Sequence, residues 1–129
     1  MKNLSSKIKP LFEKEKDIVF VYLFGSRARK ISTPFSDIDI AVFLKRKKGP
    51  YYKLRLLERL YSLLETNNVD LVILNETNLP LQYRILRDGK LVVDKDPLLR
   101  HKFFSLTLRK YHDFAIKEEQ IFNRRFYGR

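Results

Sequence analysis

The spacing of apolar residues in the first third of the chain predicts one helix followed by two strands. Leu4–Lys16 carries apolar residues at helical intervals and predicts a helix, with Pro10 near its middle. Ile18–Phe24 (IVFVYLF) is too short for a good helix and rich in β-branched and aromatic residues, which predicts a buried central strand. Asp37–Leu44 (DIDIAVFL) begins with strict alternation, which predicts a second strand with its two aspartates on one face.

The remaining chain alternates between the apolar spacing of helices and that of strands. Tyr52–Glu65 predicts an amphipathic helix and Val69–Leu74 a third strand. Leu79–Arg87 predicts a short helix, Lys90–Asp94 an edge strand, and the pattern is again helical from Pro97 onward. The predicted fold is therefore α/β (α+β): a mixed sheet of about four strands flanked by helices, with a long C-terminal helix.

Length and composition indicate a single domain. A chain of 129 residues fits one hydrophobic core, and no internal repeat or Pro/Gly/Ser linker divides it. We expect one domain over 1–129, with its core at about 18–94 and a helical segment at 97–127. No run approaches the roughly 20 apolar residues of a membrane span, the N-terminus lacks a signal-peptide run, and cysteine is absent. These features favour a cytoplasmic protein without disulfides.

The charge is strongly basic, at +12 from 27 Lys and Arg against 15 Asp and Glu. Such a field attracts polyanions, which include nucleic acid, nucleoside triphosphates and acidic protein faces. Charge alone does not choose among them, and a solvated basic surface explains it equally well. His101 and His112 are expected to be surface residues without a metal.

Three aspartates are the candidates for metal binding. Asp37 and Asp39 point to the same side of their predicted strand. Two carboxylates about 4 Å apart repel by about 4 kcal/mol at an effective dielectric near 20, and a bound divalent cation relieves that repulsion. Asp70 lies on the next predicted strand, so the three carboxylates converge if the strands pair in register, an arrangement that suits two metal ions. The alternative for Asp37 and Asp39 is a solvated pair of acids at an exposed strand end. The alternative for Asp70 is an acid at the start of a strand.

A glycine–serine turn follows the first predicted strand. Gly25 and Ser26 precede a predicted helix start, where free backbone N–H groups bind phosphate. Arg27, Arg29 and Lys30 add positive charge beside this turn. Alone the turn is weak support for a phosphate site, because Gly-Ser turns are common.

Taken together, these features resemble the minimal nucleotidyltransferase (MNT) family of the DNA polymerase β-like nucleotidyltransferase superfamily. The resemblance lies in Gly25-Ser26, ten intervening residues and Asp37-Ile38-Asp39 (GSRARKISTPFSDID), completed by Asp70 on a later strand. It covers roughly residues 18–94. One departure is Lys30, where many relatives carry glycine, so the helix entry is expected to differ in angle.

The resemblance implies a role for each matching position. Gly25 and Ser26 would hold the β- and γ-phosphates of ATP. Asp37 and Asp39 would bind two Mg²⁺ ions, and Asp70 would join the metal at the attacking hydroxyl and assist its deprotonation. Three further residues would approach the nucleotide, with ordinary surface or turn roles as the alternative: Arg27, Arg29 and Ser36.

The resemblance also implies a partner. Stand-alone MNT proteins are often antitoxins that adenylylate a tyrosine of a HEPN ribonuclease toxin. The C-terminal segment from Pro97 is basic and rich in phenylalanine, so part of it is expected to form an interface with a HEPN-type protein, although core packing would also explain it. Three alternatives stay open: nucleotidyl transfer to a small molecule, transfer to RNA, and a non-catalytic antitoxin that acts by binding. The basic charge also leaves nucleic acid open as a partner.

Overall fold

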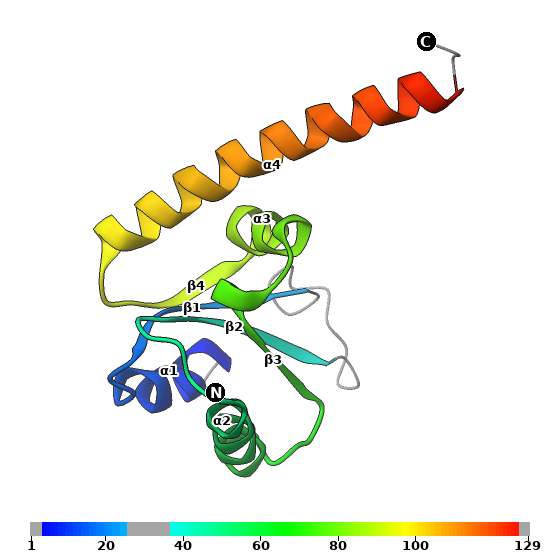
Figure 1. Cartoon of the computed structure of the whole chain (residues 1–129). Coiled ribbons are helices and arrows are strands. Elements are labelled where there is room, and N and C mark those ends of the chain that lie inside the picture. The colour runs from blue at the N-terminus through cyan, green and yellow to red at the C-terminus, as the bar shows by residue number, and fades with distance from the viewer. Residues whose placement is uncertain (1–3, 26–36, 127–129) are drawn as a thin grey trace.

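A four-stranded mixed sheet with two helices on each face forms the body of the molecule (Figure 1). The computed structural model describes residues 4–25 and 37–126. Along the sheet the strand order is β3-β2-β1-β4. The strands are β1 (Ile18–Phe24), β2 (Ile38–Leu44), β3 (Val69–Ile73) and β4 (Lys90–Asp94). The helices are α1 (Leu4–Glu13), α2 (Pro50–Leu64), α3 (Leu79–Asp88) and α4 (Pro97–Phe126), with a short 3₁₀ helix η1 (Leu74–Glu76) after β3.

The pairing of the strands explains their different compositions. β1 is central and antiparallel to both β2 and β4, while β2 and β3 run parallel and are connected by α2. Helices cover both faces of β1, so nearly every residue of that strand is buried and apolar. The predictions of a mixed sheet, a central first strand and an edge fourth strand are confirmed.

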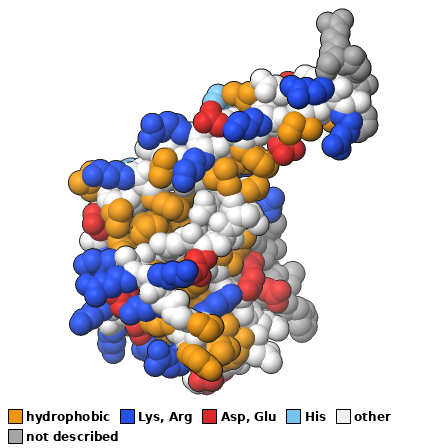
Figure 2. Space-filling model, in the orientation of Figure 1, with side chains coloured by type: hydrophobic (Ala, Val, Ile, Leu, Met, Phe, Trp, Pro, Cys, Tyr) orange, Lys and Arg blue, Asp and Glu red, His pale blue; other side chains and the backbone are white. Residues whose placement is uncertain are grey.

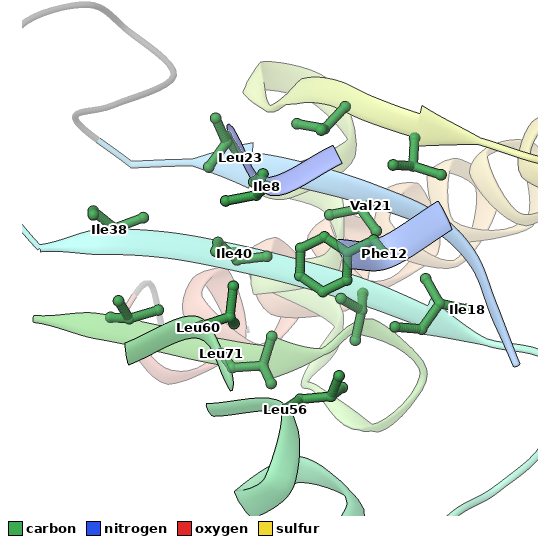
Figure 3. Packing of buried hydrophobic residues seen from close by; sticks show 14 of the residues in the cluster. Ile8, Phe12, Ile18, Val21, Leu23, Ile38, Ile40, Leu56, Leu60 and Leu71 are labelled. Atoms are coloured by element: carbon green, nitrogen blue, oxygen red, sulfur yellow. The ribbon is translucent and has the colours of Figure 1, made fainter. Parts of the chain in front are cut away.

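The larger core lies between the sheet and the pair α1 and α2 (Figure 3). Ile8 and Phe12 of α1 and Leu56 and Leu60 of α2 point toward the sheet and are almost completely buried. Leu57 of α2 is half-buried and packs against this core. α2 begins at Pro50, two residues earlier than predicted, because proline has no N–H to lose at the first helical position.

An aromatic cluster fills the opposite face, under α3 and the first half of α4. The rings of Phe20 and Phe43 stack with centroids 4.5 Å apart, and Phe103 of α4 packs edge-on against Phe43 at 4.9 Å. Tyr83 of α3 stacks on Tyr111 of α4 at 4.0 Å. These contacts orient α3 and α4 relative to the sheet, and α3 forms part of the pocket described below.

The chain after β3 differs from the predicted strand. Leu74 begins η1 instead of continuing the strand, and Asn75 then bonds both backbone groups of Leu44. The Asn75 side chain accepts from the Leu44 N–H at 2.8 Å and donates to its carbonyl at 2.9 Å. This connection ties the end of β3 to the end of β2. Within the described residues, no helix is sufficiently long and apolar to span a bilayer.

Candidate functional site

Two of the three predicted metal ligands face each other across adjacent strands. In the parallel β2–β3 pair, Asp39 is directly opposite Asp70. Their neighbours Ile38 and Val69 are also paired and point to the other side, into the core with α1 and α2. Residues opposite one another in register share a face of the sheet, so both aspartates lie on the side covered by α3. The predicted register of these two strands is confirmed.

Asp37 lies just before β2 and completes the acidic group. Its side chain is exposed, as is that of Asp70, whereas Asp39 is half-buried. Burial raises the pKa of Asp39 above its ordinary value, and the negative charges of Asp70 and then Asp37 raise it further. The three carboxylates therefore lie close enough for their charges to interact.

The turn after β1 lies directly against Asp39. Gly25 has φ of 71°, in the left-handed region that glycine adopts without strain. A Cβ atom at Gly25 would lie 2.4 Å from Oδ2 of Asp39. Glycine is thus required here for two reasons, backbone conformation and close approach, and it brings the turn beside the carboxylate.

Asp39 and Gly25 line a small pocket of about 180 Å³ under α3. Asp70 lines a separate shallow hollow of about 290 Å³ at the free edge of β3, together with Lys53 and Glu76. Each member of the Asp39–Asp70 pair thus lines a different cavity, Asp39 the pocket and Asp70 the hollow. The residues that line the pocket are Phe24, Gly25, Asp39, Leu81, Arg84 and Asp88.

Sequence reasoning missed the contribution of α3. Leu81, Arg84 and Asp88 lie at intervals of three and four residues, which places them along one side of that helix. No motif marks them, and their spacing would be equally typical of a solvated helix face. Only the packing of α3 over the sheet brings them beside Asp39.

Four of the predicted nucleotide-binding residues lie outside the described residues, so their roles stay predictions. They are Ser26, Arg27, Arg29 and Ser36.

The acidic group is better suited to a magnesium ion than to a metal ion held entirely by protein side chains. Within residues 4–25 and 37–126, no three acidic, histidine or cysteine side chains form a ready-made ligand cluster. Magnesium commonly takes only one or two carboxylates and completes its shell with water and substrate phosphates. Half-buried Asp39, flanked by the exposed carboxylates of Asp37 and Asp70, provides that kind of donor set.

Comparisons with known proteins relate the fold to a known family. A family profile described as "Polymerase beta, Nucleotidyltransferase" matches residues 6–98, more than two thirds of the chain. A search of curated protein sequences gives no significant match.

Several solved structures that resemble the chain come from toxin–antitoxin complexes. One, a toxin–antitoxin with AMP-PNP, matches with a TM-score of 0.81 and 25% identity over 94% of this chain and 97% of that chain. A chain of an MntA–HepT complex matches with a TM-score of 0.72 and 25% identity over 92% and 93%. A third belongs to a complex of tri-AMPylated Shewanella oneidensis HEPN toxin with MNT antitoxin, with a TM-score of 0.73 and 25% identity over 92% of each chain.

The raised pKa of Asp39 predicts a pH-dependent stability difference. An aspartate whose pKa is raised in the folded state destabilises that state when it ionises. This penalty is absent below the pKa of the unfolded state, about 3.9, and complete above the pKa of the folded state. Asp39→Asn should therefore increase the free energy of unfolding of the metal-free protein at pH 7.5, by less than about 1 kcal/mol because water screens this half-buried group. The gain should shrink toward zero near pH 4. Urea denaturation at both pH values measures it.

The matched control is Glu58→Gln, which neutralises an exposed acid on α2, on the other side of the sheet. Its effect should be near zero at both pH values. A less stable Asp39→Asn protein at pH 7.5 would contradict the electrostatic description of the site.

Gly25→Ala should damage nucleotide binding more than folding. The left-handed φ costs about 1–2 kcal/mol with a Cβ, and the new methyl group forces the Asp39 carboxylate to rotate away. We expect affinity for a fluorescent ATP analogue with magnesium to fall by at least about tenfold, while urea denaturation shows a folded protein. Gly49→Ala is the control, because Gly49 has φ of −76° and nothing lies within 4 Å of its added Cβ. Similar losses in both variants would exclude the proposed contact with Asp39.

Proposed function

Because the chain belongs to the polymerase β nucleotidyltransferase family, we propose that it is an MNT antitoxin that transfers AMP from ATP to a tyrosine hydroxyl of a HEPN toxin. The observation that carries this proposal is the register of β2 and β3, which pairs Asp39 with Asp70 beside the Gly25 turn. Support for the acceptor comes from the similar structure described as a tri-AMPylated HEPN toxin with its MNT antitoxin.

The two hollows beside the aspartates suggest how the two substrates would approach. ATP would occupy the pocket under α3, with its triphosphate against the backbone of Gly25. The tyrosine would approach from the free edge of β3, where Asp70 is exposed to solvent. The hydroxyl would then lie on one side of Asp39 and the leaving phosphates on the other.

In the proposed reaction, the tyrosine oxygen attacks the α-phosphorus in line. The bond from that phosphorus to the oxygen bridging the β-phosphate breaks, and pyrophosphate leaves with the bonding electrons. Asp70 would accept the hydroxyl proton and pass it to water. Magnesium would be held in two sites by Asp37, Asp39 and Asp70. When bound, it supplies charge neutralisation at the phosphates.

The C-terminal half of α4 supports a protein partner. Residues 112–125 are all exposed, and at about 1.5 Å per residue the helix extends about 22 Å beyond Tyr111 (Figure 1). Along this part the hydrophobic side chains lie uncovered at the surface (Figure 2). A single helix that makes no packing contacts is marginally stable in water, so a partner would stabilise it.

The apolar stripe that anchors α4 to the domain continues into its exposed half. The contacts of α4 with the domain recur every four residues, at Phe103, Thr107 and Tyr111. The same side of the helix continues with Phe114, three residues after Tyr111, and Ile121, seven residues further. Phe114 is 38% exposed and Ile121 49%. We assign this continuation, Phe114 and Ile121, as the docking stripe for the HEPN partner.

The test of the reaction uses the chain, magnesium, ATP labelled on the α-phosphate and its HEPN partner. We expect label on a partner tyrosine, and Asp39→Asn and Asp70→Asn should each reduce the labelling rate by at least about 100-fold. Glu58→Gln, an exposed acid away from the site, should leave the rate unchanged. Mass spectrometry of the partner identifies the modified residue.

Three results would replace the proposal with an alternative. A tight complex without label under any nucleotide would indicate an antitoxin that acts by binding. Label on added RNA, or on an aminoglycoside, would indicate a different acceptor. Full activity of Asp39→Asn would refute the metal assignment.

Docking through α4 predicts different effects for two isoleucines of that helix. Ile121→Glu places a charge in the docking stripe and should weaken the complex with the HEPN partner by at least about tenfold. Ile116→Glu is the matched control: Ile116 is 41% exposed and lies about 140° around the helix from Ile121, so its effect should be small. Isothermal titration calorimetry measures both affinities. Equal effects would exclude the stripe as the interface.

A further inference from the structure

The wall of the nucleotide pocket formed by α3 is held rigidly in place. The Asn78 side chain accepts a hydrogen bond from the Leu81 N–H at 3.0 Å and so caps the start of the helix. Gln82 donates to the Leu74 carbonyl at 2.9 Å, which ties α3 to the end of the sheet. Ile85 and Leu86 are buried in the aromatic cluster. Arg84 therefore projects from a backbone whose position is set by packing.

Arg84 is an exposed cation on α3. Within the part of the chain that the structure describes, no hydrogen bond or ion pair joins its guanidinium to another residue. Its neighbour Arg87, by contrast, forms a bidentate pair with Asp88 at 2.9 and 2.7 Å. The Asp88 carboxylate in the pocket is thus already engaged by a different arginine.

Arg84 and Asp39 line the same pocket, and among the described residues no hydrogen bond or ion pair joins them. The positive charge of Arg84 consequently stays available for an anion that enters the pocket.

We propose that Arg84 binds the β- and γ-phosphates of the incoming nucleoside triphosphate from the α3 side of the pocket. The guanidinium presents a planar fork of N–H donors that matches phosphate oxygens in a bidentate manner, which lysine does not reproduce. Arg84 and the backbone of Gly25 line the same pocket and would contact the triphosphate from different elements. This inference rests on the proposed nucleotidyltransferase function and adds a phosphate-binding residue to it.

The experiment compares ATP and AMP as ligands of Arg84 variants, by calorimetry in the presence of magnesium. Arg84→Met should lower affinity for a non-hydrolysable ATP analogue by at least about tenfold and affinity for AMP by less than about twofold. Arg84→Lys should give an intermediate loss. Arg55→Met is the control, since Arg55 is an equally exposed arginine on α2 across the sheet. In the labelling assay, Arg84→Met should raise the KM for ATP.

The outcomes separate this inference from the function on which it rests. If the wild-type chain binds ATP and labels its partner while Arg84→Met binds ATP normally, the Arg84 assignment is wrong and the function stands. Equal losses of ATP and AMP affinity would also overturn the assignment to the β- and γ-phosphates, because they would place Arg84 at the part the two ligands share, the base, sugar and α-phosphate. A wild-type chain that binds no ATP would overturn both. Thermal unfolding of Arg84→Met confirms that the variant is folded.

Discussion

Parallel pairing of β2 with β3 in a single register is the constraint on which the candidate site depends. It places Asp39 opposite Asp70 although 31 residues separate them in the chain. Burial maintains the register, because Ile38, Ile40 and Leu71 all point into the core shared with α1 and α2. A slip of one residue would turn Asp70 toward that core and expose Leu71. The apolar face of these strands thus positions the acidic residues on the other face.

The acidic group is destabilising for the folded chain and useful for catalysis. Asp39 is half-buried next to two other carboxylates, and its raised pKa records that ionisation is unfavourable there. The two apolar cores around the sheet offset this penalty, and a cation with a triphosphate would relieve it directly. Sites that bind charged ligands commonly reduce the stability of the ligand-free protein in this way. The proposed Arg84 contact provides a complementary positive charge on the opposite wall.

The long helix α4 divides into two parts with different physical roles. Its first half packs on the sheet through Phe103 and on α3 through Tyr111, and thereby holds α3 over the pocket. In its second half the same stripe is exposed. A partner bound to that second half would be linked to the pocket through α3. The family relationship and the exposed stripe therefore support one proposal, an antitoxin that modifies the protein it binds.

Local patterns were sufficient to predict every strand and long helix and the Gly25 turn, because side-chain periodicity and turn geometry depend on neighbouring residues. The exact ends were less predictable, as at η1, where the bonds from Asn75 to β2 compete with continuation of the strand. Contacts between distant segments determine the strand order, the contribution of Arg84 to the pocket and the point where α4 leaves the domain. A solvated arginine and a pocket arginine have the same local sequence pattern, and packing distinguishes them.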